Sequence, residues 1–151
     1  MILDLVDGYE VKTFFETGTF RADSLKWIAD RKPDLDCISV ETEIEYYLFS
    51  KMRTRFSRNI RLIHGQSIYA LNDYVNSEKA SQLTLYWLDA HWNKINPLKE
   101  ELRIISSAKN PSIIIIDDIE DFDNRFIYED FKKIIEPENS IKKYLTIMDL
   151  V

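Results

Sequence analysis

VKTFFETGTF, at residues 11–20, is an apolar run that ends in a polar, glycine-containing turn. The β-branched and aromatic residues favour a strand over 11–16, and the polar turn favours a strand end followed by a helix. The same arrangement recurs along the chain. The further strand candidates are residues 35–41, 60–64, 83–89, 112–118 and 144–151, of which the isoleucine run at 113–116 is typical of a strand buried on both faces.

Helix-like stretches separate these strands. Apolar residues recur at helical spacing over 22–31, from about 43, over 67–77, after Asn96-Pro97 and over 122–136. Short connections between alternating strands and helices produce a parallel sheet with helices on both faces. The sequence therefore predicts an α/β, Rossmann-like, doubly wound and mostly parallel sheet, abbreviated to about six strands, in a single domain over residues 1–151.

Two helix starts carry specific signals. Thr42-Glu43-Ile44-Glu45 has the pattern of a capping box, and Asn96-Pro97 offers an N-cap with Pro97 as the first helical residue. Ile44, Leu48 and Met52 then give the first of these helices an apolar stripe. A basic cluster follows, which is either a solvated helix end or a phosphate-binding patch: Lys51, Arg53, Arg55, Arg58 and Arg61.

The composition excludes several classes of function. Only three of the 151 residues are glycine, which argues against a glycine-rich phosphate cradle. The net charge of −6 argues against nucleic acid as a partner, and the single cysteine, Cys37, rules out an internal disulfide. No apolar run is long enough to cross a membrane. We expect a soluble, cytoplasmic protein with no membrane partner.

Polar residues follow each predicted strand, where the carboxyl ends of parallel strands form a ligand-binding edge. Polar residues also end strands and cap helices in general, so each set has a structural alternative. Gly18 can let a ligand approach the backbone, and Glu41, 23 residues later, has the spacing of an acid that holds ribose hydroxyls. Gln66 can pair with an adenine edge, whereas Ser67 can equally cap the next helix.

These residues resemble the class I S-adenosylmethionine-dependent methyltransferases. The most similar motifs are those of a bacterial and phage-like group with E-T-G-T-(F/Y), G-D-S, L-D-A-H-W and I-D-D after strands one, three, four and five. This chain has ETGTF at 16–20, GQS at 65–67, LDAHW at 88–92 and IDD at 116–118, so the resemblance spans about residues 12–120. The chain departs from the group at Gln66, where aspartate is usual.

The resemblance implies which residues bind S-adenosylmethionine. The methionine part would lie against the first strand end, the ribose against the second, and the adenine against the third. The implied cofactor-binding residues are Glu16, Thr17, Gly18, Thr19, Glu41, Gln66, Ser67 and Asp89.

A metal site is also implied, by similarity to metal-dependent O-methyltransferases of the catechol and macrocin types. Asp89, Asp117 and Asp118 match the acids that hold a divalent cation in those enzymes. Carboxylates brought together repel one another without a cation, and oxygen ligands suit Mg²⁺ or a similar ion. Asp117 or Asp118 capping a helix is the alternative. His91, close to Asp89, is the candidate catalytic base, with contact to substrate or metal, or simple packing, as the other options. Asp89 is the second candidate catalytic residue.

The sequence thus predicts an O-methyltransferase that acts on a small-molecule or sugar hydroxyl. A glycosyltransferase that uses nucleotide sugars, and a non-catalytic module that binds S-adenosylmethionine, remain the alternatives. With residues 144–151 as the only segment left for closing strands, a homodimer that completes the sheet edge is a further expectation.

Overall fold

The computed structural model describes residues 2–90, 97–108, 111–117 and 144–145. The first half of the chain forms α1 (Ile2–Gly8), β1 (Thr13–Thr17), α2 (Asp23–Arg31), β2 (Asp36–Glu41), α3 (Ile44–Arg53) and β3 (Ile60–His64). The rest forms α4 (Ser67–Val75), a 3₁₀ turn (Glu78–Ser81), β4 (Thr84–Leu88), α5 (Leu98–Ser107), β5 (Ser112–Ile116) and β6 (Tyr144–Leu145). The predicted helix over 122–136 lies outside the described residues.

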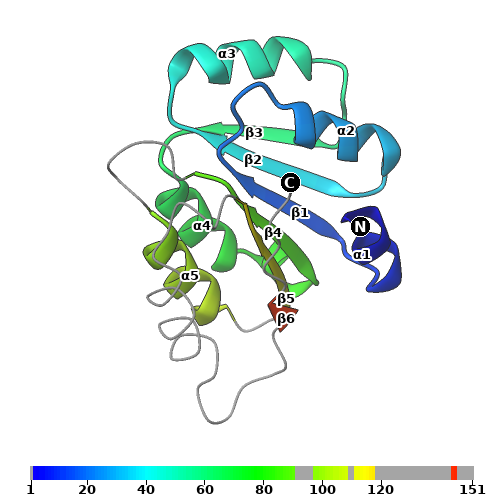
Figure 1. Cartoon of the computed structure of the whole chain (residues 1–151), viewed down its shortest axis with the longest axis vertical. Helices are drawn as coiled ribbons and strands as arrows, with labels where there is room; N and C mark the ends of the chain where they lie inside the picture. Colours follow the sequence, from blue (N-terminus) through cyan, green and yellow to red (C-terminus); the bar gives the residue numbers. More distant parts are fainter. Residues whose placement is uncertain (1, 91–96, 109–110, 118–143, 146–151) are drawn as a thin grey trace.

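The strands form one parallel sheet in the order β3-β2-β1-β4-β5-β6. Chain order runs outward from β1 to β3 and then returns to β4 on the other side of β1. The order therefore reverses between β1 and β4, which is the position where such sheets bind ligands. This arrangement confirms the predicted α/β, doubly wound parallel fold, with six strands among the described residues (Figure 1).

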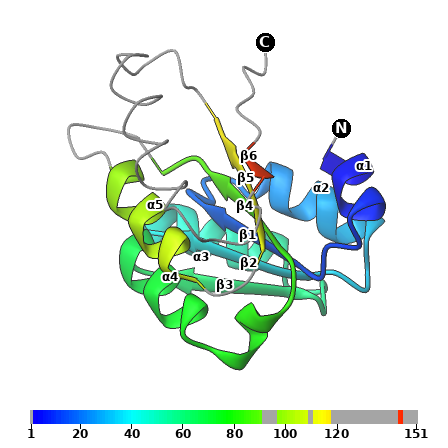
Figure 2. The same ribbon diagram turned by 90° about the horizontal axis from the view of Figure 1, so that it is seen from below.

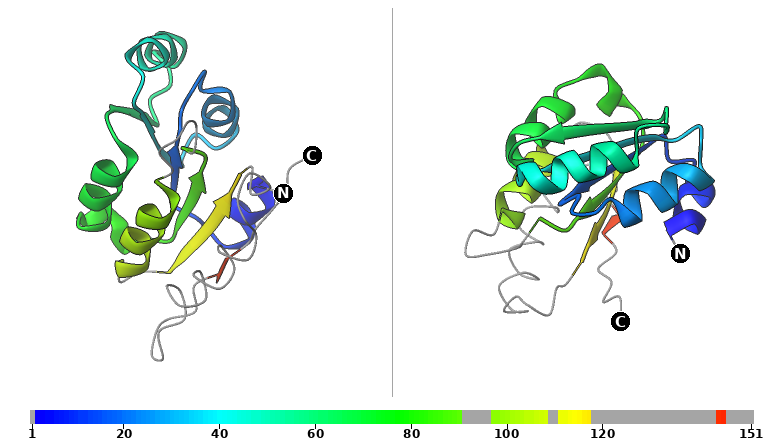
Figure 3. Two further views of the ribbon diagram at one scale, coloured as in Figure 1. Left: turned by 60° about the vertical axis from the view of Figure 1, so that its left-hand side comes forward. Right: turned by 90° about the horizontal axis from the view of Figure 1, so that it is seen from above.

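Helices cover both faces of the sheet. Helices α1, α2 and α3 lie on one side and α4 and α5 on the other (Figures 2 and 3). Phe14 and Cys37 pack with residues of α1 and α2, whereas Phe15 and Tyr86 pack with residues of α4 and α5. Every residue of β1, β4 and β5 is buried, as the isoleucine run predicted for β5. No helix within the described residues is long and apolar enough to span a membrane.

The helix starts differ from the sequence predictions. Glu43, not Thr42, is the N-cap of α3, and its own side chain makes no capping hydrogen bond. The Glu43 amide instead donates to Glu41 Oε1 at 2.9 Å, so the carboxylate at the end of β2 takes the role that the capping box would have had. Pro97 is the N-cap of α5 and not its first helical residue.

The apolar stripe of α3 faces solvent, whereas an amphipathic helix normally packs such a stripe against the core. Ile44, Leu48 and Met52 are exposed, although their spacing predicted a helix face packed on the sheet. The helix itself was predicted correctly, and its orientation was not, because spacing defines a face without saying which surface covers it. Helix α1 and the 3₁₀ turn were not predicted.

Candidate functional site

The loop after β1 closes against the end of β4. Gly18 adopts φ +84°, and a Cβ atom there would lie 2.8 Å from the carbonyl carbon of Asp89 and closer still to its oxygen. The Asp89 amide donates to the Thr17 carbonyl at 3.1 Å, and the amides of Gly18 and Thr19 donate to the Val40 carbonyl. Gly18 is therefore required first by the close approach of two strand ends at the reversal of strand order.

Glu16 is buried beneath this loop on the α2 side of the sheet. Its Oε2 accepts a hydrogen bond from Ser39 Oγ at 2.6 Å, and Ser39 Oγ lies 2.6 Å from Thr19 Oγ1. Burial raises the pKa of Glu16 to about 8, against the opposing effect of the Ser39 hydrogen bond, and the charges of Asp89 and Glu41 raise it further. Glu16 is thus protonated at neutral pH.

Glu41, at the end of β2, orients the backbone around it. Its Oε2 accepts from the Phe20 amide at 2.7 Å, while Oε1 accepts from the Glu43 amide. The carboxylate consequently holds both the loop after β1 and the start of α3. Each oxygen has a second lone pair, so the carboxylate can still accept hydrogen bonds from a ligand.

Glu16, Glu41 and Asp89 bring three carboxyl groups to the ends of β1, β2 and β4. The charges of Glu41 and Asp89 act on Glu16, which shows that the three groups are close enough to interact. Glu41 and Glu16 are buried, and Asp89 is half-buried. Because Glu16 is protonated at neutral pH, the negative potential of this edge comes from Glu41 and Asp89, and it favours a cationic or hydroxyl-bearing ligand and disfavours a phosphate.

A further acid, Glu101 of α5, lies on the opposite side of the sheet and was missed by sequence reasoning. Burial raises its pKa to about 7, against the opposing effect of hydrogen bonds with Ser67 and Thr17. Its Oε1 has no hydrogen-bond partner within the part of the chain that the structure describes. Its position in the sequence could have indicated a buried acid, because Glu101 shares a helix face with Leu98, Leu102 and Ile105, which are all buried.

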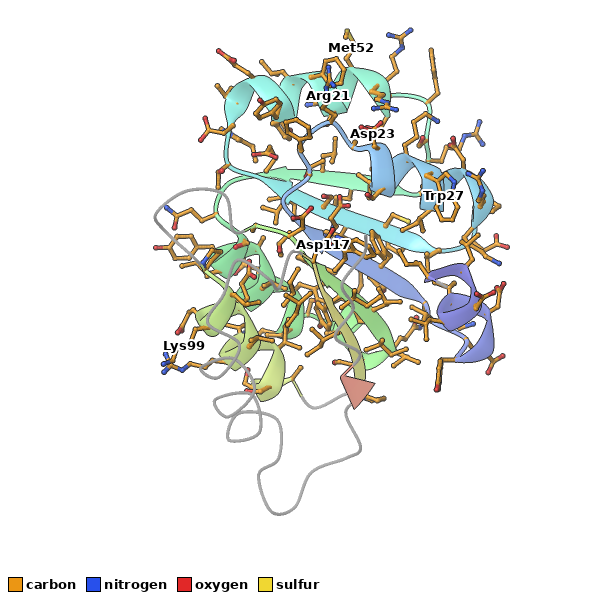
Figure 4. The ribbon with its side chains drawn as sticks, viewed as in Figure 1. Arg21, Asp23, Trp27, Met52, Lys99 and Asp117 are labelled. Carbon is orange, nitrogen blue, oxygen red and sulfur yellow. The ribbon has the colours of Figure 1, made fainter. Side chains whose placement is uncertain are left out.

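The remaining predicted residues are placed as follows. Gln66 is exposed and is the N-cap of α4, and its side chain makes no capping hydrogen bond. Ser67 is buried as the first residue of that helix, so it does not cap it. Asp117 directly follows β5, and its amide donates to the Leu88 carbonyl at 3.1 Å (Figure 4).

His91 and Asp118 lie outside the described residues. Among the residues that are described, no group of three or more His, Cys, Asp or Glu side chains is arranged to hold a metal ion. The predicted trio of Asp89, Asp117 and Asp118 therefore has only two members in the described part of the chain. Both follow adjacent parallel strands, β4 and β5.

Two solved structures have folds similar to that of this chain. The chain is similar to the crystal structure of a Staphylococcus aureus protein assigned as a caffeoyl-CoA O-methyltransferase, at 18% identity and a TM-score of 0.61, covering 89% of this chain and 67% of that one. This chain has a methyltransferase fold. A second similar structure is the methyltransferase domain of bacterial CtHen1-CN, at 13% identity and a TM-score of 0.56, covering 85% of this chain and 69% of the other. No protein-family model and no curated protein sequence matches the chain.

Proposed function

We propose that the chain is a methyltransferase that binds S-adenosylmethionine at the carboxyl ends of β1, β2 and β4. The carrying observation is the pair of carboxylates, Glu41 and Asp89, on either side of Gly18 at the reversal of strand order. A sulfonium cofactor is cationic and has no phosphate, so its charge complements this edge, whereas the diphosphate of a nucleotide sugar would be repelled. The fold similarity supports the same ligand class.

The residues present fit such a ligand. Glu41 would accept hydrogen bonds from the two ribose hydroxyls with its remaining lone pairs. The exposed Gln66 and the neighbouring Ser67 would contact the adenine, and the loop of Thr17, Gly18 and Thr19 would contact the methionine part. Glu16, at the base of this loop, would position Thr19 through Ser39.

The reaction we propose is methyl transfer to a hydroxyl of a small molecule or sugar. The cofactor supplies an electrophilic methyl group, and the protein has to orient the acceptor and remove its proton. His91 is the proposed base, in the segment that follows Asp89. Asp89, Asp117 and Asp118 are proposed to hold a divalent cation such as Mg²⁺, which would lower the pKa of the acceptor hydroxyl.

S-Adenosylhomocysteine, the product form of the cofactor, should raise the melting temperature of the wild-type chain. Glu41→Gln keeps one acceptor for the backbone amides but removes the charge and one ribose acceptor, so we expect affinity to fall about tenfold or more. Thermal-shift titration measures the effect. Asp73→Asn, a change of an exposed acid on α4, is the control that should bind as wild type. No shift in the wild type at about 1 mM ligand, or equal affinity in Glu41→Gln, would contradict the proposal.

The cation makes a separate prediction. Asp117→Asn replaces a charged ligand with a neutral one, so calorimetric Mg²⁺ binding and any Mg²⁺-dependent activity should be lost. Binding of S-adenosylhomocysteine without metal should remain, which distinguishes loss of the cation site from loss of the fold. If the variant keeps the wild-type response to EDTA, Asp117 does not hold the cation.

A further inference from the structure

Helix α3 presents its apolar side to solvent. Ile44, Leu48 and Met52 follow one another at four-residue spacing, and their side chains are 48%, 56% and 58% exposed. Phe56, just beyond the end of the helix, is 83% exposed. Figure 4 shows Met52 on the outer side of α3, away from the sheet. These four residues are called here the α3 stripe.

The inner side of α3 carries two buried hydroxyl residues, and Tyr47 stacks on the His64 ring at the end of β3. Ser50 and Thr54 are buried, and Ser50 Oγ donates to the Phe20 carbonyl at 2.7 Å while Thr54 Oγ1 donates to the Ser50 carbonyl at 2.8 Å. The helix is therefore inverted relative to an ordinary surface helix, which turns its apolar side to the core. Such an inversion is not needed for the fold, because the polar inner side already attaches the helix to the loop after β1.

Two aromatic residues of α3 outside the stripe are also partly exposed. Tyr46 and Phe49, on the same helix, are each about two-fifths exposed. Exposed apolar side chains that are grouped, and not scattered singly, are a feature of protein interaction sites. The stripe is therefore the expected contact surface for a partner.

The charges at the two ends of α3 have opposite signs. Glu43 and Glu45 lie at its N-terminal end, and Lys51 and Arg55 lie at and beyond its C-terminal end. None of these four side chains forms an ion pair with another described residue: Lys51 lies over the Tyr47 ring, and Arg55 over the Phe56 ring. Acids at the N-terminal end and bases at the C-terminal end also complement the helix dipole, so these charges do not by themselves indicate a partner. The exposed stripe is the reason to expect one.

We infer that the α3 stripe is the contact surface of a symmetric homodimer in which the α3 helices of two copies pack antiparallel. A two-fold axis near Leu48 would bring the two stripes together and place the acidic end of each helix beside the basic end of the other. The surface is thus complementary to itself in its apolar stripe and in its charges. An anionic lipid surface is less well matched, because Glu43 and Glu45 and the net charge of −6 would be repelled from it.

Self-association of the full chain tests the interface. Sedimentation velocity on the wild type, at concentrations up to about 0.5 mM, should show a monomer and a dimer in exchange, with a dissociation constant on the order of 1–100 μM for a contact of this size. Leu48→Glu should weaken association at least about tenfold. The matched control is Tyr69→Glu, which introduces the same charge at a 65% exposed aromatic residue of α4 and should leave the dimer intact.

Exchanging charges tests the antiparallel arrangement without touching the apolar contact. A variant with Glu43→Lys and Glu45→Lys has two basic ends, and a variant with Lys51→Glu and Arg55→Glu has two acidic ends. Each alone should remain monomeric, and an equimolar mixture should form a heterodimer, with circular dichroism confirming that both are folded. A wild type that is monomeric at every concentration, a dimer that survives Leu48→Glu, or a monomer that binds phosphatidylserine vesicles would overturn the inference.

Discussion

Gly18→Ala should destabilise the chain by about 2–5 kcal/mol. Gly18 has φ +84°, where an alanine costs about 1–2 kcal/mol, and the added Cβ would overlap the carbonyl group of Asp89. That group is backbone at the end of β4, so it cannot rotate away as a side chain would. Relieving the overlap requires β1 and β4 to separate at their ends, which adds about 1–3 kcal/mol. Urea denaturation measures the change.

Gly8→Ala is the matched control for this prediction. Gly8 is the last residue of α1, and a Cβ atom there would meet nothing within 4 Å. Alanine has the higher helix propensity, so we expect an unchanged or slightly greater stability, by up to about 1 kcal/mol. If Gly18→Ala and Gly8→Ala had similar stabilities, the close contact between the loop after β1 and Asp89 would not exist in solution.

The strands were predictable from sequence because their signal is local. The runs at 11–16, 35–41, 60–64, 83–89 and 112–118 each match an observed strand to within two residues at either end. The orientation of α3 was not predictable in this way. Its apolar spacing is that of a helix packed on a sheet, and only the burial of Ser50 and Thr54, with the hydrogen bond from Ser50 to the Phe20 carbonyl, shows that this side faces inward.

Some residues of the candidate site could likewise be placed from sequence, and others could not. Glu41 and the ETGT turn follow strands directly, so the parallel topology brings them to one edge as soon as the strands are known. Ser39 and Glu101 could not be placed from sequence in this way. Ser39 is an interior strand residue that joins Glu16 to Thr19, and Glu101 reaches the site from a helix distant in sequence. Their roles depend on the pairing of elements, which local patterns do not specify.

The buried carboxyls should make the chain less stable as the pH rises from 5 to 8. In the folded chain the pKa of Glu16 is raised to about 8 and that of Glu101 to about 7, from an ordinary value of 4.5. Between 4.5 and these values the folded state binds more protons than the unfolded state, so stability is greatest at low pH and is lost through this window. The loss is up to about 1.4 kcal/mol per pH unit for each group.

Glu16→Gln isolates one of these contributions, because glutamine keeps the shape of the protonated acid and does not ionise. The stability of Glu16→Gln relative to the wild type should rise with pH until about 8, whereas for Glu101→Gln the rise should end near 7. Urea denaturation at each pH unit gives both curves. A stability difference between variant and wild type that is the same at every pH would arise from lost hydrogen bonds alone. It would show that the carboxyl titrates in the folded chain as it does in the unfolded chain. A rise for Glu16→Gln alone would restrict the unusual electrostatics to the α2 side of the sheet, where Glu16 lies near Asp89 and Glu41.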